Sequence, residues 1–299
     1  MPDDSLPFAV QSVAAADVTP TIAVPEDPSA VNVSIPARDH EPVRSRNDAF
    51  AERAATRIWH EQPSAENPYI AQSARCYGYD LSALMQGCSY VDVFYLLLRG
   101  ELPEPDVAEL LEALMIGFIH PGPRHPAARA AMNAAVGKTD PLHILPIATG
   151  VMGGQYLGAG AVESTMRFLR KNLMSDPAAM ALDLITQPEN QIPGFGQIYA
   201  GIDQLSVQIA QNLLALPAAG AALRWGQVMH EQLEPHNQGW LNVGVAAAAF
   251  CDLGFQPRAG GALMQLLCAP GLLAQGLEMA NKPITAMPFV KDENYVLKS

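Results

Sequence analysis

The residues best suited to chemistry gather in one short stretch of the sequence. It holds histidines, carboxylates, side-chain amides and an indole, namely His230, Glu231, Glu234, His236, Asn237, Gln238 and Trp240. Histidine titrates near physiological pH, and a side-chain amide can donate a hydrogen bond to a carbonyl oxygen. For His230 and Glu231, a solvated helix face explains the pattern equally well. We expect His236 to line a polar cleft with Gln197 and Asn242.

A glycine-bracketed turn precedes this stretch. Pro193 fixes φ, while Gly194 and Gly196 permit conformations or close approaches that a Cβ would block. A helical pattern follows soon afterwards, so backbone N–H groups of the turn can face a ligand. Such a turn can also simply redirect the chain, and its residues alone leave both interpretations open.

In order along the chain, several segments resemble the citrate synthase superfamily. Its N-terminal signature is similar to residues 75–81 (Arg-Cys-Tyr-Gly-Tyr-Asp-Leu) and 93–103 (Val-Phe-Tyr-Leu-Leu-Leu-Arg-Gly-Glu-Leu-Pro). Residues 193–196 (Pro-Gly-Phe-Gly) fall where the family carries a Gly-Phe-Gly-His loop, and residues 241–246 and 269–274 resemble the closing segments of the citryl-CoA lyase branch. The resemblance implies an all-α, citrate synthase-like fold in which a large and a smaller helical domain flank a cleft. It also implies a homodimer.

The family's chemistry makes or breaks a carbon–carbon bond next to a CoA thioester. The resemblance implies a carboxylate that removes an α-proton and two histidines that stabilise the enolate and polarise the partner carbonyl. This sequence departs from all three positions: residues 154–160 contain no histidine, Gln197 follows Gly-Phe-Gly, and Gly244 follows Asn-Val. Losing a general base alone costs about 10²–10⁴-fold in rate. Ordinary citrate synthase or citryl-CoA lyase activity is therefore not expected.

The candidate site consists of the residues at these positions and their neighbours. Gln197 keeps an amide donor, so we take Gln197, His236 and Asn242 as candidate catalytic residues. The candidate substrate-binding residues are Gln155, Tyr156, Leu157, Gly158, Phe195, Gly196, Tyr199, Asn237 and Gly244. No metal site is expected.

Other histidines and arginines have simpler interpretations. The segment from His120 to His125 places two histidines at a spacing compatible with metal ligands, but its prolines favour a structural turn. Arg75, Arg124 and Arg129 can each bind a substrate carboxylate, although a structural salt bridge is the favoured interpretation for any one of them.

The charge distribution bears on cofactors and partners. Between Asn172 and Asn281 only Arg224 and Arg258 are basic, whereas eight residues are Asp or Glu. The resemblance implies a CoA thioester, but CoA phosphates usually require Arg or Lys, so the usual mode of CoA binding is not expected. Backbone amides, the other subunit or a heteromeric partner can compensate. The net charge of −12 argues against nucleic acid or an anionic membrane as partner.

Composition also indicates whether the chain spans a membrane and in which compartment it is expected. Hydrophobic residues make up 49 % of the 299, yet no uninterrupted apolar run approaches the roughly 20 residues of a membrane span. The nearest is residues 262–277, which suits a buried helix. The cysteines show no metal-type spacing, and the start of the chain has no apolar leader, so we expect a cytoplasmic protein with reduced thiols.

The pattern along the chain predicts an all-α protein without a convincing sheet. A Pro- and Ala-rich tail occupies residues 1–45, with one strand-like stretch at 31–35, and a helical pattern begins at Asn47. Asp106 is the expected cap of a helix that stops at His120. Further helices are expected at 126–136, 163–173, 204–216, 219–233, 243–253 and 259–280. We assign residues 46–190, completed by about 270–299, to a large domain and 191–269 to a small one.

Two functions remain open. In one, the protein acts on a small carbonyl or polycarboxylate-type substrate by nonstandard carbon–carbon lyase or condensation chemistry. In the other, it is catalytically silent and binds a metabolite or a partner subunit. Small residues at 150–161 and 246–249 suit either a dimer interface or packing within one chain.

Overall fold

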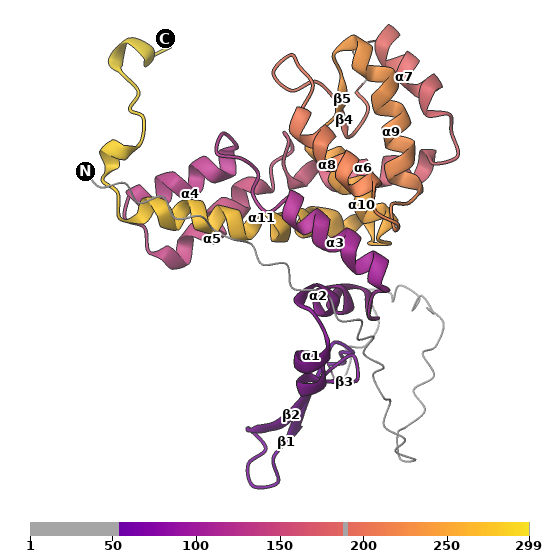
Figure 1. Cartoon of the computed structure of the whole chain (residues 1–299). Helices are drawn as coiled ribbons and strands as arrows, with labels where there is room; N and C mark the ends of the chain where they lie inside the picture. The colour runs from indigo at the N-terminus through magenta and orange to yellow at the C-terminus, as the bar shows by residue number, and fades with distance from the viewer. Residues whose placement is uncertain (1–53, 188–190, 299) are drawn as a thin grey trace, which may run out of the picture. The chain divides into compact units, whose positions relative to one another are not determined.

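The computed structural model describes residues 54–187 and 191–298 (Figure 1). The described residues form two compact units, one ending at Ser89 and the other beginning at Tyr90. The tail at 1–45 and its strand-like stretch lie outside the described residues. The division into domains at 46–190 and 191–269 stays a prediction.

The first unit is built on an antiparallel sheet. Its strands are β1 (Trp59–Pro63), β2 (Ala71–Cys76) and β3 (Tyr79–Asp80), in that order, and they are followed by α1 (Leu81–Gly87). Asp80 caps α1 by accepting hydrogen bonds from the backbone N–H groups of Ser82 and Ala83. The expectation of a helical pattern without a sheet was wrong for residues 59–80, which form strands, whereas residues 47–53 lie outside the described part of the chain. All five β1 residues are exposed, so the strand shows no apolar alternation.

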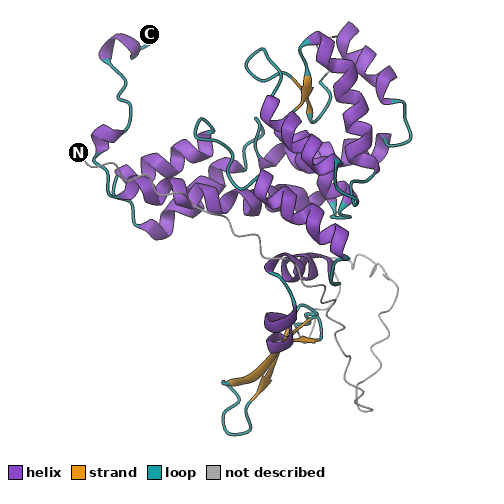
Figure 2. Cartoon of the chain, in the orientation of Figure 1, coloured by secondary structure: helices purple, strands orange, loops and turns teal. Residues whose placement is uncertain are grey.

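The second unit is almost entirely helical (Figure 2). Its α-helices are α2 (Tyr90–Arg99), α3 (Pro105–Gly117), α4 (Pro126–Val136), α5 (Pro141–Met152), α6 (Val162–Asn172), α7 (Pro177–Thr186), α8 (Gln204–Leu214), α9 (Ala221–Leu233), α10 (Asn242–Asp252) and α11 (Pro257–Ala280). The all-α fold class is confirmed, as are the helices expected from Asp106 onward. The expected cap was wrong: Glu104 occupies the N-cap of α3, and Asp106 lies in its first turn. Pro105 starts this helix because proline suits the first helical position.

Helix α11 organises the core of this unit. It packs against α4, α5 and α6, while α10 packs against α6 and α9. Among the described helices, α11 alone is long and apolar enough to span a membrane, but residues along one face, including Leu263, Leu267 and Leu272, are buried against its neighbours. The alanines at 246–249 are fully buried within this chain. Packing inside one chain thus accounts for these small residues.

A break in the hydrogen bonding of α11 at Pro270 and Gly271, called the Gly271 notch below, positions the loop between α3 and α4. Pro270 interrupts the hydrogen-bond ladder of α11, and the N–H of Gly271 donates to the carbonyl oxygen of Ile119 at 3.0 Å. A Cβ on Gly271 would lie 2.4 Å from that oxygen. Glycine is therefore required for the close approach that fixes the backbone next to His120.

Candidate functional site

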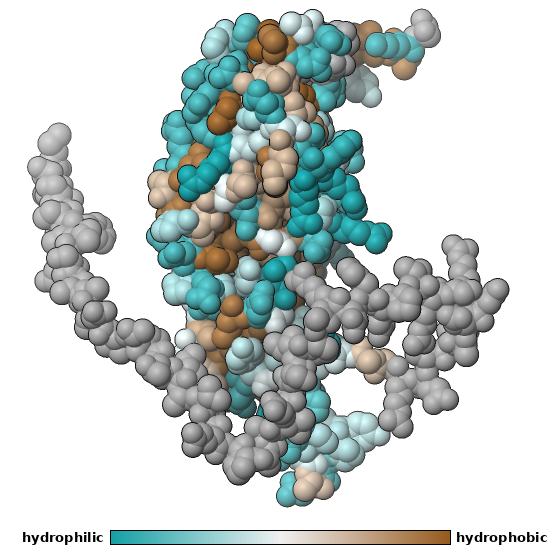
Figure 3. All heavy atoms as spheres, turned by 90° about the vertical axis from the view of Figure 1, so that its right-hand side faces the viewer, coloured by the Kyte–Doolittle hydropathy of each residue, from teal (hydrophilic) through white to brown (hydrophobic). Residues whose placement is uncertain are grey.

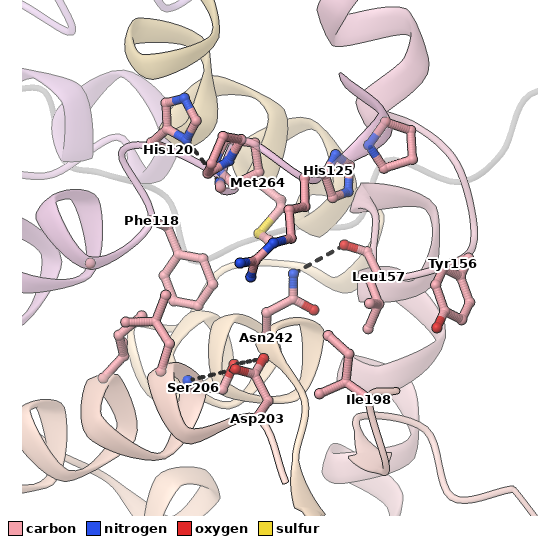
Figure 4. A pocket seen from close by; sticks show the side chains of 18 of the residues that line it. Phe118, His120, His125, Tyr156, Leu157, Ile198, Asp203, Ser206, Asn242 and Met264 are labelled. Atoms are coloured by element: carbon pink, nitrogen blue, oxygen red, sulfur yellow. Dashed lines mark hydrogen bonds between the residues drawn. The ribbon is translucent and has the colours of Figure 1, made fainter. Parts of the chain in front are cut away.

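A cavity of about 420 Å³ opens between the α3–α4 loop and the starts of α8 and α10 (Figure 4). It has the size of a small-molecule site. Its lining residues come from five separate parts of the sequence: Gly117, Phe118, His120, Pro121, Gly122, Pro123, Arg124, His125, Pro126, Arg129, Tyr156, Leu157, Ile198, Tyr199, Asp203, Leu205, Ser206, Ile209, Asn242 and Met264.

The α3–α4 loop holds two histidines in defined orientations. His120 Nδ1 accepts a hydrogen bond from the N–H of Gly122 at 2.8 Å. His125 is the N-cap of α4, and its Nδ1 accepts from the N–H of Ala127 at 3.1 Å. The expectation of a structural turn holds for the backbone, but both histidines are also lining residues of the cavity.

The charges on the cavity wall favour an anion. Arg124 and Arg129 both line the cavity, and neither forms an ion pair with another described residue. The salt-bridge interpretation for these two arginines was therefore wrong. Asp203 contributes a carboxylate, but Ser206 engages it through its hydroxyl at 2.6 Å and its N–H at 3.3 Å. Among the described residues, two arginines and one carboxylate thus line the cavity.

Asn242 ties the start of α10 to the loop before α6. Its Nδ2 donates to the carbonyl oxygen of Leu157 at 3.0 Å, and its Oδ1 accepts from the N–H of Val243 at 2.8 Å. Leu157 has a φ of 53°, a left-handed conformation that a leucine rarely adopts. Since an amide carries two N–H groups, Asn242 retains one donor beyond the bond to Leu157.

A tight hairpin forms another part of the wall. Ile198 and Gly201 form an isolated antiparallel bridge, so Tyr199 and Ala200 are the two turn residues. Their φ values of 49° and 60° match a type I′ turn, which normally requires glycine or asparagine. Asn237 anchors this turn by donating from Nδ2 to the carbonyl oxygen of Ala200 at 2.7 Å. Tyr199 reaches the cavity and is 78 % exposed.

The structure brings four of the sequence-predicted residues to the cavity: Tyr156, Leu157, Tyr199 and Asn242. The exposed side chains of Gln155, Gln197 and His236 do not line it. Asn237 supports the hairpin. The catalytic grouping of Gln197 and His236 with Asn242 stays a prediction.

The other predicted residues lie in packing positions. Phe195 stacks on Trp240 with ring centroids 4.7 Å apart, and Gly196 pairs with Gly239 in the sheet of β4 (Phe195–Gly196) and β5 (Gly239–Trp240). Gly158 is buried beside the loop carrying Leu157. A Cβ on Gly244 would lie 2.0 Å from the carbonyl oxygen of Gly194. The backbone of Gly194 therefore fills the space that a side chain at position 244 would need.

Sequence reasoning missed part of the polar lining. It named Arg124 and Arg129 as able to bind a substrate carboxylate, but it did not propose a binding role for His120, His125, Asp203 and Ser206. The available signal was a proline-rich loop carrying histidine and arginine between two amphipathic helices, because binding residues often sit on loops held by rigid elements.

Burial shifts the pKa values of two histidines and two cysteines. Burial lowers the pKa of His125; the nearby Leu157 carbonyl opposes this shift, and His120 adds to it. Burial also lowers the pKa of His230, which is 3 % exposed and packs against Gly239. Burial raises the pKa of Cys251 to about 11 and that of Cys268 to about 12, so neither thiol is a ready nucleophile. No cluster of three metal-ligating side chains occurs within residues 54–187 and 191–298.

The outer surface is mixed in character. On the face shown in Figure 3, apolar and hydrophilic residues lie side by side. Large apolar side chains are nevertheless exposed on α5 and α11: Leu142 is 80 % exposed and Leu266 is 52 % exposed.

Solved structures place this chain in the citrate synthase-like fold class. It is similar to citryl-CoA lyase from Hydrogenobacter thermophilus, with a TM-score of 0.67 and 23 % identity over 82 % of this chain and 94 % of that one. It is also similar to ATP citrate lyase from Methanothrix soehngenii in complex with citrate and coenzyme A (TM-score 0.62, 17 % identity), covering 84 % of this chain and 44 % of that one. The resemblance read from the sequence is confirmed for the fold.

A citrate synthase from Thermotoga maritima shares the fold at a TM-score of 0.56 and 20 % identity. That match covers 70 % of this chain and 58 % of the synthase, so this chain spans little more than half of its length. No model of a known protein family matches the sequence, and no curated protein matches it.

Proposed function

We propose that this chain binds a small polycarboxylate or carbonyl-containing carboxylate in the cavity and acts on it by carbon–carbon lyase or condensation chemistry. The observation that carries the proposal is that two arginines, Arg124 and Arg129, line the cavity and form no ion pair with any other residue that the structure describes. Guanidinium groups bind carboxylates through paired, charge-assisted hydrogen bonds. The fold supports the reaction class, because a protein of the same fold is captured with citrate and coenzyme A.

Each polar group has a role in this proposal. The arginines hold the carboxylates of the substrate, and the remaining donor of Asn242 faces a carbonyl or enolate oxygen. Asp203 is the carboxylate of the cavity wall and serves as proton acceptor. Gln197 and His236 would join only if the adjoining loops move towards the cavity. A CoA thioester is not required for binding, although the fold makes it the first cosubstrate to test.

A catalytically silent binding protein is the second candidate. One observation favours it: the Gly194 backbone fills the space of any side chain at position 244, where the resemblance implies the general base. The cavity would then bind the same class of anion without turning it over, and a heteromeric partner could supply the missing groups.

Calorimetry of citrate and tricarballylate binding tests the proposal. Replacing Arg124 or Arg129 with glutamine should weaken binding about 10- to 100-fold, because hydrogen bonds to charged groups contribute about 1.5–3 kcal/mol. The control is Arg258→Gln, since Arg258 is exposed and does not line the cavity. Equal loss in the control would show that the cavity is not the site.

Two NMR assays separate the candidates: citrate with and without CoA, and oxaloacetate with acetyl-CoA. Loss of the citrate methylene signals in the first would support lyase chemistry, their appearance in the second would support condensation, and binding without either reaction would support the silent protein. A wild-type protein that binds no carboxylate would refute both.

We further propose a homodimer in the cytoplasm. The exposed apolar side chains along α5 and α11, including Leu142, Ile147 and Leu266, support contact with a second copy. Light scattering on the purified protein checks this, and a monomer at micromolar concentration would contradict it.

A further inference from the structure

The side of the cavity formed by α3 and α8 carries apolar side chains. Phe118, which follows α3, lines the cavity together with Leu205 and Ile209 from the first turns of α8. Helix α3 packs against α8, and a Cβ on Gly117 would lie 3.1 Å from Cγ2 of Ile209. Figure 4 shows Phe118 on the same side of the cavity as Ser206, the residue after Leu205. A ligand made only of carboxylates and hydroxyls has no group that suits this apolar wall.

Packing of α8 does not explain Leu205. The apolar side chains that α8 buries in the core belong to Val207, Ala210 and Leu213, whereas Leu205 is 62 % exposed. A single exposed leucine is common on protein surfaces, but this one lines a cavity together with Ile209. Ligand sites are typically concave and lined by apolar side chains, which the bound ligand covers.

The anionic contacts come from other elements than the apolar ones. Arg124 lies in the loop before α4 and Arg129 in α4 itself. On α8, the hydroxyl of Ser206 already donates to Asp203 at 2.6 Å, and Ser206 is buried. A volume of about 420 Å³ falls within the range of pockets that hold drug-sized ligands. A ligand that uses the whole lining therefore needs both an anionic and an apolar part.

We propose that the cavity selects a carboxylate that bears a hydrocarbon substituent, and that Leu205 and Ile209 determine this specificity. The inference rests on the proposed function and narrows its substrate class. The arginines bind the carboxylates, and the hydrocarbon covers the apolar side chains of α8. Each methylene group that this contact removes from water should raise the affinity up to about fourfold.

A homologous series of alkylmalonates tests this specificity. The carboxylates stay the same through malonate, methylmalonate, ethylmalonate and butylmalonate, and only the hydrocarbon grows. Calorimetry on the wild-type protein should show rising affinity, with butylmalonate at least about tenfold tighter than malonate. Equal affinity for malonate and butylmalonate would overturn the inference.

Three variants assign the gain to α8. Leu205→Ala should lower the ratio of butylmalonate to malonate affinity at least about threefold and change tricarballylate affinity by less than about twofold. Leu205→Met conserves the apolar volume and should keep the wild-type ratio. The control is Leu182→Ala, since Leu182 is 60 % exposed on α7 and is not among the described lining residues. Thermal unfolding checks that each variant is folded, and an unchanged ratio in folded Leu205→Ala would also overturn the inference.

These outcomes are distinct from those that test the proposed function. Tricarballylate binding that depends on Arg124, with no gain from the butyl group, would refute the inference and leave the carboxylate site in place. A wild-type protein that binds neither tricarballylate nor any of the malonates would refute both.

Discussion

At the scale of single residues, two residues of the cavity wall and one neighbour adopt backbone conformations that side chains usually avoid. Leu157, Tyr199 and Ala200 all have φ between 49° and 60°. A left-handed conformation costs a non-glycine residue about 1–2 kcal/mol. Such residues persist only where their surroundings hold them, as Asn242 does at Leu157 and Asn237 does at Ala200. Their clustering around one cavity is typical of a functional site.

Replacing Ala200 with glycine should stabilise the protein. Glycine tolerates a φ of 60° without strain, so we expect the free energy of unfolding to rise by about 1 kcal/mol in urea denaturation. The matched control is Ala262→Gly, an exposed position inside α11, where the same chemical change should cost about 1 kcal/mol. Destabilisation by Ala200→Gly would show that the turn is not held in the left-handed region.

At the scale of elements, the site depends on how closely α10 approaches the turn that carries β4. Gly194 has a φ of 86°, and its carbonyl oxygen accepts from the N–H of Leu241 at 3.0 Å. A Cβ on Gly194 would lie 2.7 Å from the Cα of Gly244. The backbones of Gly194 and Gly244 are therefore in direct contact. This contact fixes the start of α10, from which Asn242 donates its hydrogen bond to the Leu157 carbonyl oxygen.

Replacing Gly244 with alanine should cost about 1–3 kcal/mol of unfolding free energy, because the added methyl group overpacks a filled site. Gly150→Ala is the control, since no atom lies within 4 Å of a Cβ there and α5 should gain up to about 1 kcal/mol. Chemical denaturation of both variants measures the difference. Gly244→Asp should likewise destabilise the protein and should not create lyase activity; a stable, active variant would contradict this account.

The sequence allowed prediction of elements more readily than of the site. Helices such as α4 and α11 follow from apolar periodicity and from prolines at helix starts, both of which are local signals. The strands at 59–80 were missed because their exposed residues show no alternation. The cavity unites segments near positions 120, 157, 199, 203 and 242, and only tertiary packing brings them together. The Gly271 notch that positions His120 has no local signal at all.

At the scale of the whole molecule, the chain is negatively charged, whereas the lining of the cavity holds more arginines than carboxylates. The formal net charge is −12, yet Arg124 and Arg129 line the cavity, and Asp203 is the only carboxylate among its described lining residues. The surrounding negative charge opposes the approach of an anion, whereas the local guanidinium groups favour it. A site that holds an anion in such a chain must rely on short-range hydrogen bonds more than on long-range attraction.

The cavity and the hydrophobic core belong to the same compact unit. The core cluster is drawn from residues 91–287, and the cavity lining from residues 117–264. In the first unit, by contrast, the buried apolar side chains among the described residues are Cys76 and Leu84. The unit that begins at Tyr90 therefore has its own core, as an independently folding domain requires.

A fragment of residues 90–299 should consequently fold by itself. We expect cooperative thermal unfolding, a helical circular dichroism spectrum and tricarballylate affinity within about threefold of the full chain, because every lining residue is retained. The control fragment, residues 120–299, lacks α2 and α3 and with them the core residues Tyr95, Leu110, Leu111 and Leu114. It should fail to unfold cooperatively. Loss of cooperative unfolding in the longer fragment as well would mean that residues 1–89 are needed to stabilise the helical core.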